Sequence, residues 1–183
     1  MVRHWVVAWM RAASLSLPGM ALAGGLTLSS PDLAPDAMLK PAQVYQGGGC
    51  RGRNLSPALS WVGEPAGTRS FAVTIFDPDA PTGHGWWHWL AFDLPANTHA
   101  LASLPGGGPL PAGGVALRND FGEVGYGGAC PPEGDKPHHY QVTLWALNVP
   151  TLGLRSDTSA ETALAALRAH RLASSGITVR YGR

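Results

Sequence analysis

The sequence is poor in charge, and this excludes two kinds of protein. Only 14% of its 183 residues are charged, and the formal net charge is +1. No run of Lys and Arg occurs, so we do not expect a nucleic-acid-binding protein that works by neutralising phosphates. The sequence also lacks an uninterrupted apolar stretch of about 18 residues, which a transmembrane helix needs. We therefore predict neither nucleic-acid binding nor a transmembrane segment.

Motifs for common catalytic and metal sites are also missing. The two cysteines, Cys50 and Cys130, have neither CxxC nor zinc-ligand spacing, and we predict no metal and no cofactor. No GxSxG or HExxH motif is present, which removes the usual sequence support for a hydrolase. Each cysteine lies in a Gly/Pro-rich stretch. They could pair in an oxidising compartment, and two unpaired buried thiols are the alternative.

Glycine and proline are abundant, with 24 and 16 residues spread along the chain. This distribution is typical of the turns of a mainly β protein, and the length suits one domain. Strands are predicted at 71–77, 87–94 and 139–147, with shorter ones near 24–28 and 175–181. One helix is predicted at 159–173, and residues 95–137 are predicted to be mostly loop.

The N-terminus resembles a secretory signal. Arg3 and His4 precede the apolar stretch 5–10, and a second stretch ends at Ala21-Leu22-Ala23. We predict a signal peptide over 1–23 with cleavage after Ala23, a single domain over 24–183, and a periplasmic or secreted protein. Arg11 interrupts the apolar region, so an N-terminal tail on a cytoplasmic protein is the alternative.

Polar residues continue the apolar faces of the predicted strands. In a strand, alternate side chains share a face. Asp77 follows the alternate apolar residues Phe71, Val73 and Ile75 at the end of its strand. His88 has the same parity as the residues at 90, 92 and 94. These placements predict that both polar side chains lie where the sheet meets loops.

His138 and Tyr140 repeat this arrangement on the strand at 139–147, where they share parity with the apolar residues at 142, 144 and 146. Buried polar groups need partners. A histidine can donate from both ring nitrogens to a phosphate, while Asp77 could fix a histidine tautomer or accept a ligand proton. We therefore predict one pocket that handles anions or protons.

Five motifs in this order resemble one family. They are DPDAP at 77–81, WHW at 87–89, GYGG at 125–128, PP at 131–132 and HHY at 138–140. Together they resemble the phosphatidylethanolamine-binding proteins, which include the Raf kinase inhibitor proteins, and most closely the bacterial branch. The resemblance covers nearly all of residues 24–183.

The resemblance implies an antiparallel β-sandwich with a short C-terminal helix, long pocket loops and a small pocket at one edge. The pocket residues that it implies are Asp77, His88, Pro132, His138 and Tyr140, with Gly128 and Cys130 in the wall. Both cysteine loops belong to the pocket end in this family, so we predict a Cys50–Cys130 disulfide.

Three functions remain open. The first is a non-catalytic protein that binds a small anion or a phosphorylated head group. The alternative is an inhibitor or regulator of a partner kinase or protease, which rests on analogy alone. A hydrolase or a metal enzyme built on Asp77, His88 and His138 is the least favoured.

Overall fold

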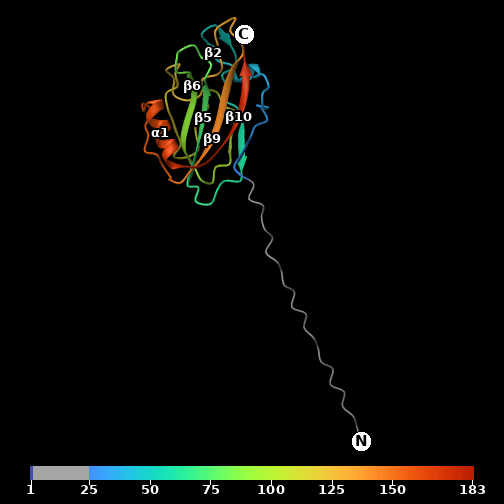
Figure 1. The fold of residues 1–183 in the computed structure, drawn as a ribbon, viewed down its shortest axis with the longest axis vertical. Helices are drawn as coiled ribbons and strands as arrows, with labels where there is room; N and C mark the ends of the chain where they lie inside the picture. Colours follow the sequence, from blue (N-terminus) through green and yellow to red (C-terminus); the bar gives the residue numbers. More distant parts are fainter. Residues whose placement is uncertain (2–24) are drawn as a thin grey trace.

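A five-stranded antiparallel sheet is the centre of the computed structural model, which describes Met1 and residues 25–183. Its strand order is β10-β9-β5-β6-β8, and Figure 1 shows β10, β9, β5 and β6 side by side. The bounds are β5 Ser70–Asp77, β6 Trp86–Pro95, β8 Val115–Ala116, β9 His138–Leu147 and β10 Arg171–Tyr181. The predicted signal peptide lies outside the described residues except for Met1.

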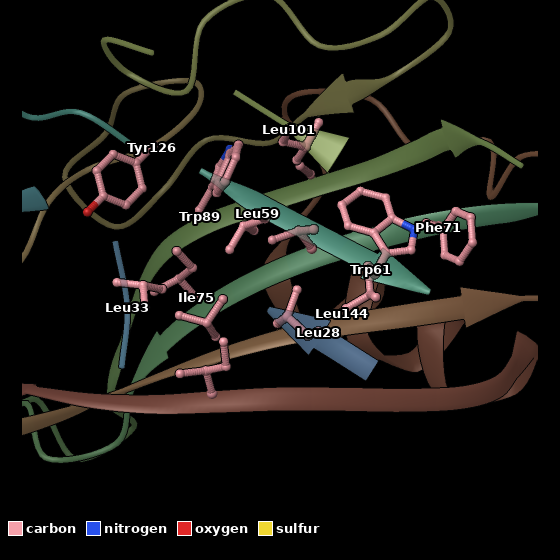
Figure 2. Packing of buried hydrophobic residues seen from close by; sticks show 14 of the residues in the cluster. Leu28, Leu33, Leu59, Trp61, Phe71, Ile75, Trp89, Leu101, Tyr126 and Leu144 are labelled. Carbon is pink, nitrogen blue, oxygen red and sulfur yellow. The ribbon is translucent and has the colours of Figure 1, made fainter. Parts of the chain in front are cut away.

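A three-stranded sheet covers one face of the large sheet and makes the fold a sandwich. Its order is β1-β4-β7, with bounds Thr27–Ser29, Leu59–Val62 and Ala100–Leu101. Figure 2 shows apolar side chains such as Trp61, Phe71 and Leu144 filling the space between the two sheets. This core positions the ends of β5, β6 and β9, where the predicted site residues lie. The predicted mainly β sandwich is thus confirmed.

The only helix of more than one turn in the described part of the chain lies on the other face of the large sheet. It is α1, Ala160–His170, and Ser159 caps it by accepting a hydrogen bond from the Thr162 amide at 3.2 Å. Ala163 and Leu167 are fully buried against the sheet. Apart from it, a single 3-10 turn, η1, spans Pro41–Gln43. No helix in the described residues is long and apolar enough to cross a membrane.

The predicted end of this helix is wrong by three residues. We expected it to reach Ala173, but it ends at His170, and Arg171 begins β10. The His170 carbonyl accepts a hydrogen bond from the Asn148 amide, and Arg171 then pairs with Leu147 at the edge of β9. Pairing with a sheet edge thus ends the helix.

The prediction that His88 shares one face of β6 with the residues at 90, 92 and 94 is also wrong. Leu90 and Phe92 pack under α1, whereas Trp89 and Leu94 face the core between the sheets. The cause is that β6 has two extra residues relative to β5: Ile75 pairs with Trp89 and Phe76 with Trp87, so that His88 is skipped. A second irregularity lies near Asp93, whose φ is +56°. Bulges of this kind re-aim side chains, and here one places His88 at the site.

A small hairpin lies beside the end of the large sheet. It pairs β2, Gln46–Gly47, with β3, Cys50–Arg51. Figure 1 shows it close to the C-terminus of the chain. Because Cys50 is on this hairpin, the disulfide described below attaches it to the loop that follows Ala129.

Candidate functional site

A cavity of about 350 Å³ opens at the end of the large sheet, where β5, β6 and β9 meet the loops. Five of the seven predicted pocket residues line it, and its other walls are mostly apolar. The lining residues are Gly48, Asp77, Ala80, Pro81, Thr82, Trp86, His88, Phe121, Cys130, Pro131, Pro132 and His138.

The Asp77 carboxylate and the His138 ring form a buried pair in this cavity. His138 Nδ1 lies 2.8 Å from Asp77 Oδ2, and the two side chains are 5% and 3% exposed. The other carboxylate oxygen, Oδ1, accepts a hydrogen bond from the Asp79 amide at 2.8 Å. Both oxygens of Asp77 are therefore engaged by the protein, and the carboxylate orients the His138 ring.

The second nitrogen of His138 lies beside a residue that the sequence analysis missed. His138 Nε2 is 3.4 Å from Asp135 Oδ2, on an exposed loop. Asp135, Lys136 and His138 all line an adjoining cavity of about 360 Å³. No motif marks Asp135, because its position depends on how the 131–137 loop folds back onto β9.

His88 is held by backbone carbonyls. Its Nδ1 lies 2.8 Å from the Gly127 oxygen and 3.1 Å from the Gly128 oxygen. Carbonyl oxygens only accept, so Nδ1 carries the proton and Nε2 of the neutral ring is an acceptor. Burial lowers the pKa of His88, and the Gly127 carbonyl opposes this only in part. The neutral ring is therefore favoured at neutral pH.

Aromatic rings make the apolar wall of the cavity. Trp86 and Phe121 lie edge to face with centroids 5.3 Å apart, and Phe121 also packs against His88 at 5.5 Å. On its other side Phe121 stacks on Tyr45 at 4.1 Å. The Tyr45 hydroxyl donates to Glu123, which fixes this outer ring. The wall is thus rigid before any ligand binds.

The opposite wall is braced by a disulfide and by the C-terminal residue. Cys50 and Cys130 form a disulfide with a Cα–Cα distance of 5.9 Å, as predicted. The bridge holds Gly48, at the tip of the β2–β3 hairpin, against the cavity. Arg183 Nε donates to the Pro131 carbonyl at 2.7 Å. Pro131 and Pro132 are therefore fixed from both sides.

Two of the predicted residues do not line this cavity. Tyr140 lies behind His88, with the ring centroids 5.1 Å apart, and lines a much smaller cavity of about 10 Å³ that also touches His88. Its buried hydroxyl has no partner among the described residues, and burial raises its pKa. The ligand contact expected for Tyr140 stays a prediction.

Gly128 is a backbone residue of the wall and lies behind its surface. Its amide donates to Asn54 Oδ1 at 2.7 Å, and its carbonyl faces His88. A Cβ at this position would lie 2.4 Å from the Tyr45 amide nitrogen. Gly128 is therefore needed for the close approach of two backbone segments, and a direct ligand contact also stays a prediction.

No set of three His, Cys, Asp or Glu side chains in the described residues is arranged to hold a metal ion. The cavity has one hydroxyl side chain, Thr82, whose Oγ1 donates to the Gly85 carbonyl at 2.7 Å. Its one sulfur belongs to the disulfide. The other polar side chains that line the cavity are Asp77, His88 and His138.

Comparison with known proteins identifies the family of the chain. Residues 29–182 match the model of the family described as phosphatidylethanolamine-binding protein. The UPF0098 protein YbcL of Escherichia coli is 46% identical, over 88% of this chain and 90% of YbcL. The lipoprotein LppC of Mycobacterium tuberculosis is 38% identical, over 68% of this chain and 56% of LppC.

The likeness extends to a solved structure. The crystal structure of YbcL, described as a new member of the mammalian PEBP family, superposes with a TM-score of 0.84 and 44% identity. It covers 87% of this chain and 99% of the YbcL chain. Sequence motifs, sandwich fold and family model agree, and the chain belongs to the phosphatidylethanolamine-binding protein family, in its bacterial branch.

Proposed function

We propose that the cavity lined by Asp77, His88 and His138 binds a small phosphorylated compound without turning it over. The observation that carries the proposal is the pair of buried imidazoles at one cavity of about 350 Å³, each held by a different partner. A cavity of this size suits a head group with a short aliphatic part. The apolar wall of Trp86 and Phe121 would contact that part.

The two histidines offer complementary hydrogen bonds to a phosphate monoester. His88 presents an acceptor at Nε2, which suits the hydroxyl of a singly protonated phosphate. A protonated His138 would donate from Nδ1 to Asp77 and from Nε2 to a phosphate oxygen, which would take the place that the Asp135 carboxylate now has 3.4 Å from Nε2. The adjoining cavity holds Lys136 together with the carboxylates of Asp79 and Asp135. Asp77 itself cannot donate, and its role is to orient His138.

A charged histidine would strengthen phosphate binding, so binding should improve on acidification. For His88 the improvement requires a pH below its ordinary value of about 6.5, because burial lowers its pKa. The acid form of His88 would then donate from both nitrogens. Titration with the ligand at a series of pH values from 7.5 downward follows the change from its neutral to its charged form.

The absence of turnover rests on the chemistry of the lining residues. A covalent mechanism through a hydroxyl or thiol needs that group to be free and activated. Thr82 is committed to the Gly85 carbonyl and Cys130 is oxidised in the disulfide. Among the described lining residues, no other hydroxyl or thiol is present.

Isothermal titration with O-phosphoethanolamine tests the proposal, with ethanolamine as the matched compound without phosphate. We expect the phosphorylated compound to bind and ethanolamine not to bind. His88→Ala and His138→Ala should each weaken binding by about tenfold, the loss of one hydrogen bond to a charged group. His139→Ala is the control, because His139 lies next to His138 but is exposed and pairs with Asp79. Equal affinity in all four proteins would remove the cavity as the site.

We further propose that the protein works outside the cytoplasm. The Cys50–Cys130 disulfide supports this, since disulfides persist in oxidising compartments, and the relative LppC is named a lipoprotein. Fractionation of expressing cells followed by N-terminal sequencing tests it. We expect periplasmic or secreted protein that begins at Gly24, whereas an intact Met1 in the cytoplasm would contradict it.

A further inference from the structure

The outer face of the large sheet carries a further cavity, larger than that of the phosphate proposal. Its residues Phe76 and Trp87 are chain neighbours of Asp77 and His88, but the two cavities share no lining residue. The helix α1 covers only part of this face, where it packs over Ala72 and Leu147. Beyond the helix lies a groove of about 710 Å³, bounded by β5, β6, β9 and α1. We call it the outer groove. Neither the motifs nor the proposed function accounts for it.

Aromatic rings lie along the outer groove. Phe76 and Trp87 pack against each other with centroids 4.3 Å apart. Gly85 supports this pair, because a Cβ there would lie 2.2 Å from the Phe76 ring. Farther along, the Trp145 indole donates to Thr74 Oγ1 at 3.0 Å, which fixes its ring. The aromatic side chains of the groove are thus held in place by the protein.

The aromatic residues are spread along the strands. Phe76 pairs with Gln141 and Ala72 pairs with Trp145, so four residues of strand separate the two aromatic positions, roughly 13 Å along the sheet. The Trp145 indole reaches back to Thr74, two residues from Phe76, so the two rings lie closer together than their strand positions.

Neutral polar side chains lie between the aromatic ones. Gln141 and Thr143 point to the outer face from β9, and neither makes a side-chain hydrogen bond with another described residue. An amide and a hydroxyl both donate and accept. A ligand on this surface should therefore carry hydroxyl groups.

The charges at the rim have both signs. Asp120 lies at one side, with Oδ2 accepting the Trp87 amide at 2.7 Å. Glu161 and Arg168 lie two turns apart on the same side of α1. The two carboxylates outnumber the one guanidinium and disfavour a polyanion. A neutral ligand meets no such repulsion.

We propose that the outer groove binds a neutral oligosaccharide. A sugar chain combines C–H faces, which pack on aromatic rings, with hydroxyl groups for side chains such as Gln141 and Thr143. An apolar lipid chain would bury these polar side chains without partners. The site is separate from the cavity at the strand ends, so it does not rest on the phosphate proposal.

Isothermal titration with chitotetraose, cellotetraose and maltotetraose tests this inference, with tryptophan fluorescence as a second readout. We expect at least one of the three to bind. Gln141→Ala should weaken that binding by about threefold or more, since it removes hydrogen bonds at an exposed residue and should leave the fold intact. Trp145→Ala should weaken it by about tenfold.

Two controls separate the outer groove from the phosphate cavity. His138→Ala should leave oligosaccharide affinity unchanged, and Gln141→Ala should leave the affinity for O-phosphoethanolamine unchanged. Failure of all three oligosaccharides to bind at millimolar concentration would overturn the inference. Binding that is unaffected by both Gln141→Ala and Trp145→Ala would also overturn it, because the sugar would then lie elsewhere.

Discussion

At the scale of single residues, the site depends on how two histidines are held. His138 is held by the Asp77 carboxylate, whereas His88 is held by the carbonyls of Gly127 and Gly128. Strand parity predicted that Asp77 lies at the pocket, and its chemistry left open whether it fixes a histidine tautomer or accepts a ligand proton. The sequence could not show which histidine, because the partner depends on the register of β5 against β9.

Asp77→Asn should destabilise the protein and weaken phosphate binding. An amide NH₂ facing the His138 Nδ1–H would replace an acceptor with a donor in a buried place. Leaving a buried hydrogen-bond donor without its acceptor in this way costs about 1–3 kcal/mol, which urea denaturation would measure. Asp79→Asn is the control, since the pair of Asp79 with His139 is exposed, and its cost should stay below about 1 kcal/mol. Equal losses of unfolding free energy in the two variants would contradict the role of Asp77 in holding His138.

The stability of the protein should fall when the pH drops below about 6.5, because His88 has a lowered pKa in the folded state. The unfolded chain then binds a proton that the folded chain resists. The stability that His88 contributes is therefore present above its unfolded pKa and is lost as the pH falls towards the folded one.

Urea denaturation between pH 5 and pH 7.5 checks this prediction. Replacing His88 with Gln should make the free energy of unfolding depend less on pH in this range. His99→Gln is a useful control, because the Glu64 carboxylate raises the pKa of His99, an effect of the opposite sign at an exposed residue. If the free energy of unfolding of His88→Gln changed with pH as steeply as that of the parent protein, the lowered pKa of His88 would be contradicted.

At the scale of elements, the strands at 71–77 and 139–147 were predicted within one residue, because their alternation is regular. The face of each residue in β6 was not predictable, since bulges at His88 and near Asp93 shift the register. The bulge nevertheless delivers His88 to the cavity. A regular strand would have carried the ring to a different position relative to β5.

Gly128→Ala should destabilise the protein and misplace the His88 ring. The added methyl would meet the backbone at Val44 and Tyr45 within 2.5 Å. A forced contact with rigid backbone costs about 2 kcal/mol or more, as thermal denaturation would show. Gly25→Ala is the control, because nothing lies within 4 Å of the position that its added methyl would occupy. A fully stable Gly128→Ala protein would exclude this close approach.

At the scale of the whole molecule, the disulfide connects the β2–β3 hairpin to the pocket loop across a sequence separation of 80 residues. The pairing of Cys50 with Cys130 was predictable, because both cysteine loops lie at the pocket end in the family that the sequence resembles. The loops themselves were not, because Tyr45 and Phe121 reach the site through tertiary contacts that no local pattern reports. Asp135 lies only three residues before His138, but it is in none of the motifs.

Replacing Cys50 and Cys130 together with Ser should lower the stability of the folded protein by roughly 4 kcal/mol in the chain-entropy model, or less where the unfolded state retains structure. The same change should weaken phosphate binding, because Gly48 and Pro131 lose their brace. Denaturation with and without reductant measures the first effect, and the parent protein should lose as much on reduction. A double variant as stable as the parent would rule out a structural role for the bridge.

The central claim is that His88 and His138 contact one phosphorylated ligand, and NMR spectroscopy of their ring nitrogens tests it most directly. Titration with O-phosphoethanolamine should shift the Nε2 signals of both histidines in parallel and saturably. The signal of the exposed neighbour His139 should not change. Shifts confined to His139, or no shift at either His88 or His138 at saturating ligand, would contradict the account.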